Sequence, residues 1–310
     1  MTDLRVVRPL ETRRLLGPSF TAVDNAMAAL APDGTLHWID LDASGAPQTH
    51  DSQTPCRFDP SMHSITWTIS PRIALDGNGI ACCVHDGGDA NPTGAYCADL
   101  RATPVRWTRA HTPGAPSGVG SGPGAIAMFH SDVWCTTDGG AHLSVSFRGD
   151  ESQLVSVASC DRAGRAVAVA GTRSLTGYRD QTIRFAPAGG ALVMVPDAPR
   201  GEPRDARLLD DGSFAVIIEN NAPRLAMRSA NGTVRTEELL LPPSLAIGVW
   251  GSHTVLTRSG RNLRAFDLET GASRSRIVDL DGPGVVCATR LGNELAAFSH
   301  DASVSVFAAE

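Results

Sequence analysis

Short apolar runs in which every second residue is polar recur along this chain. A turn of glycine, aspartate, asparagine or serine separates each run from the next, as in 26–45, 72–88, 254–271 and 294–310. Alternation with a period of two is the pattern of a half-buried β-strand, and two such runs around a turn form a hairpin. No segment carries a sustained 3.6-residue apolar period with caps at both ends, so the expected fold class is all-β.

The hairpins repeat along the whole chain. Their candidate turns are seven: Asp33-Gly34, Asp86-Gly87, Asp138-Gly139, the stretch 171–177, Asn220-Asn221, Ser259-Gly260 and His300-Asp301. A repeat of roughly 40–50 residues made of short strands points to a β-propeller. The sequence therefore predicts one domain over residues 1–310, a seven-bladed β-propeller. Pairing of the N-terminal run 5–10 with the C-terminal run 303–308 is expected to close the ring, because it removes two exposed sheet edges.

The charged residues exclude several functions. All 27 basic residues are arginine, so a Walker A lysine, a Schiff-base lysine and a Ser-Lys catalytic pair are excluded. The net charge of −6 and the lack of a basic cluster argue against a general nucleic-acid binder.

Cysteine usage and hydropathy bear on the compartment. The first 20 residues contain charges throughout and no apolar core of a signal peptide, and no window approaches 18 uninterrupted apolar residues. We therefore expect no membrane association. Seven cysteines, an odd number, are interpreted as reduced thiols, which predicts a cytoplasmic protein.

Two turns share the pattern Asp-Leu-x-x-Ser/Thr-Gly, the second with one residue fewer. They are Asp40–Gly45 and Asp267–Gly271, and a partial copy lies at 99–104. The Asp and Ser/Thr side chains can accept hydrogen bonds from turn amides, and the glycine can adopt a positive φ. The pattern resembles the strand-ending turn of PQQ-like, YVTN-type and WD40-type propeller repeats. That resemblance implies the fold and carries no function.

A third turn, at 136–143, reads Thr-Thr-Asp-Gly-Gly-Ala-His-Leu. It resembles a degenerate Asp box of sialidase-like propellers, in which His142 and Leu143 replace the last two residues. In that family the box is a structural turn. Sialidase chemistry would need a tyrosine nucleophile, and Tyr96 and Tyr178, the two tyrosines of the chain, lie in no recognisable context.

No motif identifies catalytic residues. The adjacent Cys82 and Cys83 resemble the vicinal disulfide of PQQ-dependent dehydrogenases, but two small buried residues are the simpler interpretation. The nine histidines show no metal-ligand spacing, so we expect neither metal nor cofactor. Two alternatives stay open. One is a hydrolase or lactonase with a metal or carboxylate site in the axial pocket, as in calcium-dependent lactonases. The other is a glycan-binding propeller, which the low number of aromatic residues disfavours.

The longest apparent loop lies in 105–124, a Gly/Pro/Ser-rich segment that begins near Arg106, Trp107, Arg109 and His111. Arginine and tryptophan are enriched in interface hot spots. A second insertion is expected at about 43–65. We therefore predict a non-catalytic scaffold that binds a protein partner through one face and the long loops of the first three blades. The partner, the face and the oligomeric state are left open.

Overall fold

The computed structural model contains β-strands as its regular elements. It describes residues 4–9, 19–31, 33–55, 72–75, 80–85, 94–109, 116–120, 126–129, 132–136, 142–146, 153–161, 163–174, 177–240, 247–259, 262–277, 285–299 and 304–309. Within these ranges the strands form seven four-stranded antiparallel sheets, numbered here in chain order. The predicted all-β class is therefore confirmed.

Sheets 1 to 4 each take four consecutive strands. Sheet 1 contains β2 (Ser19–Val23), β3 (Ala26–Leu30), β4 (Thr35–Leu41) and β5 (Pro47–Gln53). Sheet 2 contains β6 (Arg72–Leu75), β7 (Ile80–His85), β8 (Gly94–Asp99) and β9 (Thr108–Arg109). Sheet 3 contains β10 (Pro116–Gly120), β11 (Ile126–Phe129), β12 (Asp132–Thr136) and β13 (His142–Ser146). Sheet 4 contains β14 (Gln153–Cys160), β15 (Ala166–Ser174), β16 (Gly177–Ala186) and β17 (Val193–Met194).

Sheets 5 and 6 follow the same plan, whereas sheet 7 combines both ends of the chain. Sheet 5 contains β18 (Glu202–Leu208), β19 (Phe214–Asn220), β20 (Ala222–Arg228) and β21 (Val234–Glu238). Sheet 6 contains β22 (Gly248–Trp250), β23 (Thr254–Ser259), β24 (Asn262–Asp267) and β25 (Ser273–Ile277). Sheet 7 contains β26 (Val285–Leu291), β27 (Glu294–Ser299), β28 (Val304–Ala309) and β1 (Leu4–Pro9).

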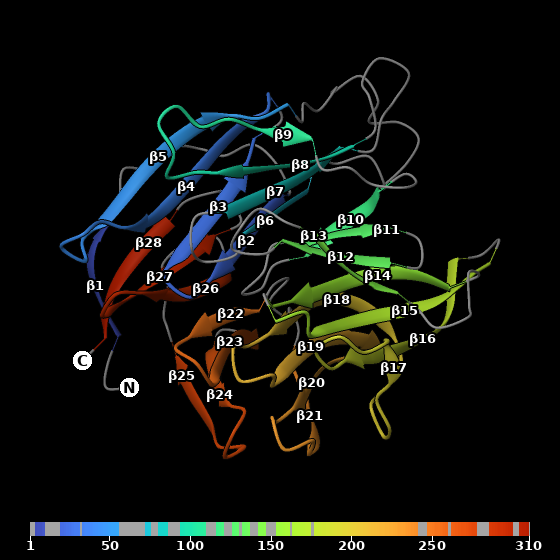
Figure 1. Cartoon of the computed structure of the whole chain (residues 1–310). Helices are drawn as coiled ribbons and strands as arrows, with labels where there is room; N and C mark the ends of the chain where they lie inside the picture. The colour runs from blue at the N-terminus through green and yellow to red at the C-terminus, as the bar shows by residue number, and fades with distance from the viewer. Residues whose placement is uncertain are drawn as a thin grey trace.

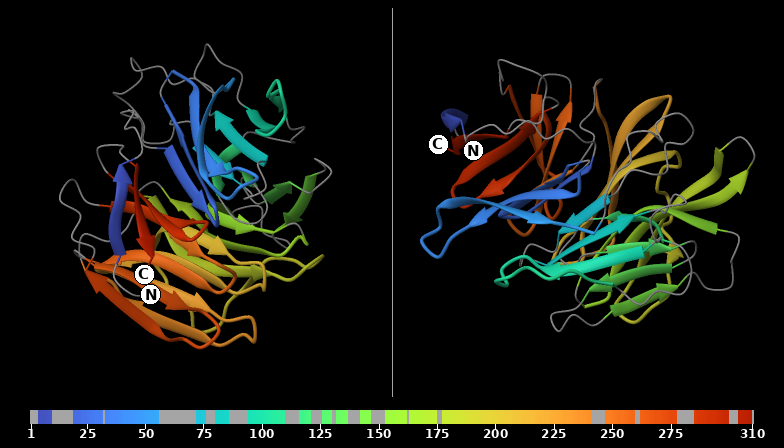
Figure 2. Two further views of the ribbon diagram at one scale, coloured as in Figure 1. Left: turned by 90° about the vertical axis from the view of Figure 1, so that its left-hand side faces the viewer. Right: turned by 90° about the horizontal axis from the view of Figure 1, so that it is seen from above.

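The first and last strands of the chain pair with each other. β1 runs antiparallel to β28, with Leu4 opposite Ala309 and Val6 opposite Phe307. The labelled N and C ends accordingly lie close together in each view, and consecutive sheets lie side by side (Figures 1 and 2). The first strands of most neighbouring sheets contact each other, including β2 with β6 and β2 with β26.

Six of the seven turns predicted from the sequence occupy equivalent places. Each of the six falls in sequence between the second and third strands of its sheet, for example Asp33-Gly34 between β3 and β4. Of these turn residues, 86–87, 175–176, 260 and 300–301 lie outside the described ranges. In sheet 4, Gly171 lies within β15, which ends at Ser174, and β16 begins at Gly177. The seventh turn, Asp138-Gly139, falls instead between the third and fourth strands of sheet 3, and the residues 137–141 of this Asp-box-like segment lie outside the described ranges.

Apolar side chains fill the spaces between adjacent sheets. Leu36 and Trp38 of sheet 1 pack with Ile73 and Leu75 of sheet 2. Sheets 4 and 5 share a core that includes Val167, Ile183, Phe214 and Val216. Similar cores join sheets 5 and 6, sheets 6 and 7, and sheets 7 and 1. Some inner strands, such as β3 and β19, are buried on both faces and are therefore continuous apolar runs rather than the alternating runs that the sequence pattern led us to expect.

The two Asp-Leu turns behave as expected in one copy and differ in the other. Asp267 Oδ1 accepts hydrogen bonds from the Glu269 and Thr270 amides, and Gly271 has a φ of 71°. In the first copy Asp42, rather than Asp40, accepts from the Ser44 and Ala46 amides. Asp40 is turned toward His50 instead, at 3.2 Å, because β4 continues to Leu41 and the turn starts two residues later.

The expectation of seven reduced thiols is wrong for two cysteines. Cys97 and Cys160 are disulfide-bonded, whereas Cys83 and Cys287 are buried and carry reduced thiols. Spacing along the chain does not reveal such bonds, because the fold decides which sulfur atoms come within reach. In the part of the chain that the structure describes, no helix could cross a membrane.

Candidate functional site

Three of the predicted partner-binding residues, Arg106, Trp107 and Arg109, lie at or beside the edge strand β9 of sheet 2. Arg106 is exposed and precedes β9, and Arg109 ends β9 opposite Tyr96 of β8. The side chain of Arg109 and the whole of His111 lie outside the described residues. The Gly/Pro/Ser-rich stretch of 105–124 is not one continuous loop, because it contains β10, the first strand of sheet 3, while the residues before it include the edge strand β9.

Trp107 is anchored rather than free. Its ring packs against the core between sheets 1 and 2, and its Nε1 is buried without a hydrogen-bond partner among the described residues. The indole therefore contributes mainly to packing, and it holds the neighbouring backbone in place. Of the neighbours Arg106 and Trp107, Arg106 is therefore the exposed residue. The second predicted insertion contains β5, and its residues 56–65 lie outside the described ranges.

A polar cluster that the sequence did not predict joins sheets 1, 6 and 7. Asp24 follows β2; its Oδ1 accepts from the Gly251 amide at 2.9 Å and its Oδ2 from Arg290 Nη2 at 3.1 Å. Burial raises the pKa of the Asp24 carboxyl, and the Gly251 amide and Arg290 partly offset that effect. All three residues lie at or beside the turn between the first and second strands of their sheets.

The equivalent turns of sheets 5 and 6 carry a histidine–carboxylate pair. His253 Nδ1 donates to Asp211 Oδ2 at 2.9 Å, and Asp211 Oδ1 accepts from the amide and hydroxyl of Ser213. The side chains of His253 and Asp211 are 41% and 21% exposed, respectively. The Asp211 hydrogen bond raises the pKa of His253, and the charges of Asp211, Glu269 and Asp267 add to this. Such a pair can hold and release a proton near neutral pH.

Sequence spacing could not have revealed this pair, because 42 residues separate its members. The one available signal was the repeat itself. Both residues occupy the turn after the first strand of consecutive sheets, so an alignment of the repeats would have placed them side by side.

We expect the His253–Asp211 pair to make stability depend on pH. The folded-state pKa of His253 lies above its ordinary value of 6.5. The protonated His253 therefore contributes fully to the free energy of unfolding below pH 6.5. That contribution is lost as the pH rises through the folded-state pKa. Urea unfolding of wild type and H253N at pH 5.5 and 8.5 measures this. The advantage of wild type should shrink at the higher pH, and an equal difference at both values contradicts the assignment.

A buried ion pair lies on the first strand of sheet 5. Arg207 Nη1 is 2.8 Å from Asp205 Oδ1, and Asp205 Oδ2 accepts from the Ile247 amide at 2.7 Å. Burial raises the pKa of Asp205, although Arg207 and the amide oppose the effect. Burial also raises the pKa of Cys287, in β26, to about 12, so its thiol stays protonated. Among the described residues, no three metal-ligating side chains are arranged to hold an ion.

Comparison with known proteins identifies the fold. No protein-family model and no curated protein matches the chain. Solved structures do match. The WD40 domain of Doa1 has a TM-score of 0.64 at 15% identity, over 100% of this chain and 98% of that one. Virginiamycin B lyase from Staphylococcus aureus has a TM-score of 0.63 at 10% identity, over 99% of both chains. The Cps50 (Swd1) propeller domain of Myceliophteria thermophila has 0.61 at 9%, over 99% of this chain and 100% of that one.

The chain has a β-propeller fold. At these identities the likeness concerns the fold alone, and the fold hosts both scaffolds and enzymes.

Proposed function

We propose that the seven sheets are the blades of a single seven-bladed ring over residues 1–310, closed by the pairing of β1 with β28. Contacts between the first strands of neighbouring sheets and the shared apolar cores support this arrangement. The terminal pairing supports closure, since it unites both ends of the chain in one blade.

We further propose that the propeller is a scaffold that binds a protein partner through the rim of sheet 2. The observation that carries this is the exposed Arg106 next to a tryptophan anchored in the core. A rigid support lowers the entropy lost when an exposed arginine is ordered in an interface. Among the similar structures are a protein described as YCF48 bound to D1 peptide and a chain from a structure of the Mitotic Checkpoint Complex. Arg109 and His111 follow in the sequence, and we assign them to the same proposed surface.

Cross-linking in native lysate followed by mass spectrometry tests this surface. We expect R106E to lose the partner peptides that wild type captures, with at least about a tenfold drop in yield. R224E is the matched control, because Arg224 is also an exposed arginine, on β20 of sheet 5. An identical partner list for wild type and R106E would reject this rim as the binding surface.

A second candidate function is acid–base catalysis at His253. The hydrogen-bonded Asp211 holds this histidine in one orientation, as a proton-transfer group requires. One similar structure is a catalytically inactive variant of virginiamycin B lyase from Staphylococcus aureus with quinupristin. Incubation of the purified protein with quinupristin, followed by mass spectrometry, separates the two functions. Turnover that H253A abolishes would favour the enzyme over the scaffold, whereas we expect the substrate to stay intact.

The compartment is a separate question. The sequence predicts the cytoplasm, but the disulfide bonds of Cys97 and Cys160 favour an oxidising compartment, since cytosolic thiols are kept reduced. The location stays a prediction, and fractionation of cells with an antibody against the chain decides it.

A further inference from the structure

Two arginines lie in equivalent places between neighbouring sheets. Arg264 lies on β24, the third strand of sheet 6, and Arg228 lies on β20, the third strand of sheet 5. The guanidinium carbon of Arg264 is 4.6 Å from the centre of the Phe266 ring, and that of Arg228 is 4.7 Å from the centre of the Phe185 ring. Stacking of this kind holds each guanidinium plane in a defined place.

The two arginines differ in their partners. Arg264 Nη2 is 3.5 Å from Glu237 Oε2, on the outer strand of sheet 5, and Nη1 donates to the Glu238 carbonyl at 3.4 Å. Arg228 is half-buried and forms neither a hydrogen bond nor an ion pair with another described residue. Its nitrogen atoms are open to solvent. The arginine between sheets 5 and 6 thus has a carboxylate partner within the chain, whereas the one between sheets 4 and 5 has none among the described residues.

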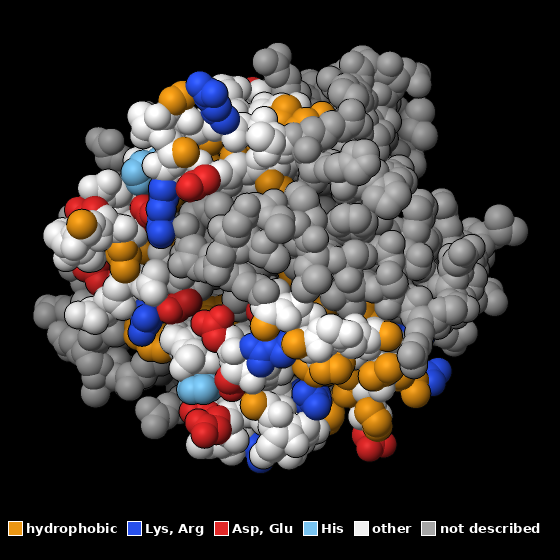
Figure 3. All heavy atoms as spheres, viewed as in Figure 1, with side chains coloured by type: hydrophobic (Ala, Val, Ile, Leu, Met, Phe, Trp, Pro, Cys, Tyr) orange, Lys and Arg blue, Asp and Glu red, His pale blue; other side chains and the backbone are white. Residues whose placement is uncertain are grey.

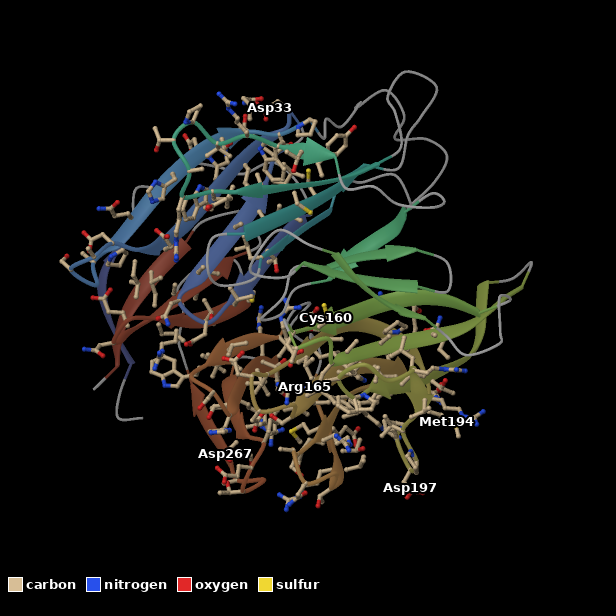
Figure 4. All side chains as sticks on the ribbon, viewed as in Figure 1. Asp33, Cys160, Arg165, Met194, Asp197 and Asp267 are labelled. Atoms are coloured by element: carbon tan, nitrogen blue, oxygen red, sulfur yellow. The ribbon has the colours of Figure 1, made fainter. Side chains whose placement is uncertain are left out.

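The outer strand of sheet 4 explains the missing carboxylate. β17 has two residues, and Val193 is the one that lies opposite Phe185. Val193 is therefore on the face of sheet 4 that turns toward Arg228, as Glu237 is on the face of sheet 5 that turns toward sheet 6. Met194, labelled in Figure 4 at the outer side of the molecule, lies on the other face of sheet 4. A valine thus stands where the next pair of sheets has an acidic residue.

Apolar side chains surround the Arg228 guanidinium. Val193 is 56% exposed. Phe185, and Val234 opposite Arg228, are half-buried against the core that sheets 4 and 5 share. In Figure 3 hydrophobic side chains gather in this part of the molecule, between β17 and β20, beside basic ones. We call Phe185, Val193, Arg228 and Val234 the arginine patch, since it combines one positive charge with apolar surroundings.

We propose that the arginine patch binds an aspartate or glutamate side chain of a partner protein, flanked by apolar residues. The carboxylate pairs with Arg228 as Glu237 pairs with Arg264, and the flanking apolar side chains cover Val193 and Val234. Charge complementarity favours this occupant, because no carboxylate of the described residues pairs with Arg228. The aromatic ring already orders the arginine, so less side-chain entropy is lost on binding. This patch is separate from the rim of sheet 2, so either proposal can fail without the other.

Phage display of short random peptides on the purified full chain tests the proposal. The library is first depleted on V193E, because the introduced glutamate supplies the carboxylate from within the chain and blocks the patch. Among the remaining peptides that bind wild type, we expect enrichment of an aspartate or glutamate between apolar residues. Fluorescence anisotropy with the most enriched peptide should show saturable binding, weakened at least about tenfold by V193E and by R228M.

R264M is the matched control, because Arg264 is stacked in the same way but has Glu237 as its partner. Binding to R264M should equal binding to wild type. A second peptide, in which the amide replaces the acidic side chain, isolates the ion pair. That change should weaken binding to wild type about tenfold and hardly alter binding to R228M. Circular dichroism checks that each variant is folded.

Three outcomes overturn the proposal. They are a library without binders after depletion on V193E, enriched peptides that lack an acidic residue, and binding that R228M leaves unchanged while it stays folded. Sedimentation velocity adds a fourth, since a wild-type dimer that V193E dissociates would make a second copy of the chain the occupant. R106E should bind the peptide as wild type does, which separates this test from that of the sheet 2 rim.

Discussion

Replacing Gly248 by alanine should unfold or severely destabilise the protein. Gly248 lies in β22, and a Cβ built there would collide with the carbonyl oxygen of Ala288 in β26. That neighbour is backbone of another sheet, so the first strands of sheets 6 and 7 would have to separate. Overpacking typically costs about 1–3 kcal/mol and occasionally more, and a collision with backbone lies at the upper end because no rotamer change relieves it. Urea unfolding of purified G248A, or its loss from the soluble fraction, measures the effect.

A glycine with open surroundings provides the control for G248A. Gly45 has a φ of 82° and no atom within 4 Å of the ideal Cβ. G45A should therefore lose only about 1 kcal/mol, from the left-handed backbone. If G248A is as stable as G45A, the close approach of β22 to β26 is wrong.

Removing the Arg207 charge should have the second largest effect. Its side chain is 3% exposed and that of Asp205 15%, so R207M leaves a carboxylate buried without its cation. Breaking such a pair costs about 3–5 kcal/mol. The pKa of Asp205 is already raised by burial and should rise further in R207M. Because the folded state then holds the proton more tightly than the unfolded state, the loss should grow as the pH rises above about 4.

Two further variants test whether the unpaired Asp205 charge causes the loss of stability in R207M. D205N in the R207M background keeps an oxygen for the Ile247 amide and removes the charge, so it should restore part of the stability. R204M removes Arg204, an exposed arginine of the same strand that forms an ion pair with Glu219. It should lower the free energy of unfolding by at most about 1 kcal/mol. Equal losses in R207M and R204M would show that the buried pair contributes no more than a surface one.

The fold was largely readable from the sequence, because its elements are local. Period-two alternation and glycine-containing turns specify hairpins through contacts between residues a few positions apart. Six of the seven predicted turns consequently lie between the second and third strands of a sheet. The difference at Asp40 and Asp42 is a shift of two residues within a correctly placed turn. Asp138-Gly139 shows the limit of this approach, because a turn pattern does not say which hairpin of a sheet it connects.

The candidate site was less predictable, because its contacts join different sheets. Arg106 and Trp107 were selected by residue type, and only packing separates an exposed arginine from an anchored tryptophan. The His253–Asp211 pair and the stacking of Arg228 on Phe185 each depend on two neighbouring sheets. Residue type alone does not indicate which of many possible partners, far away in the sequence, a side chain will contact.

The sequence by itself determined that the chain forms repeated antiparallel hairpins, that lysine chemistry is absent and that no known catalytic motif is present. Only the tertiary structure decided which groups meet between sheets. It also showed that Cys97 and Cys160 each form a disulfide bond. The physical reason is the distance along the chain between the residues that interact. Strand and turn formation depend on neighbours along the chain, whereas burial, ion pairing and edge exposure depend on how the sheets pack in space.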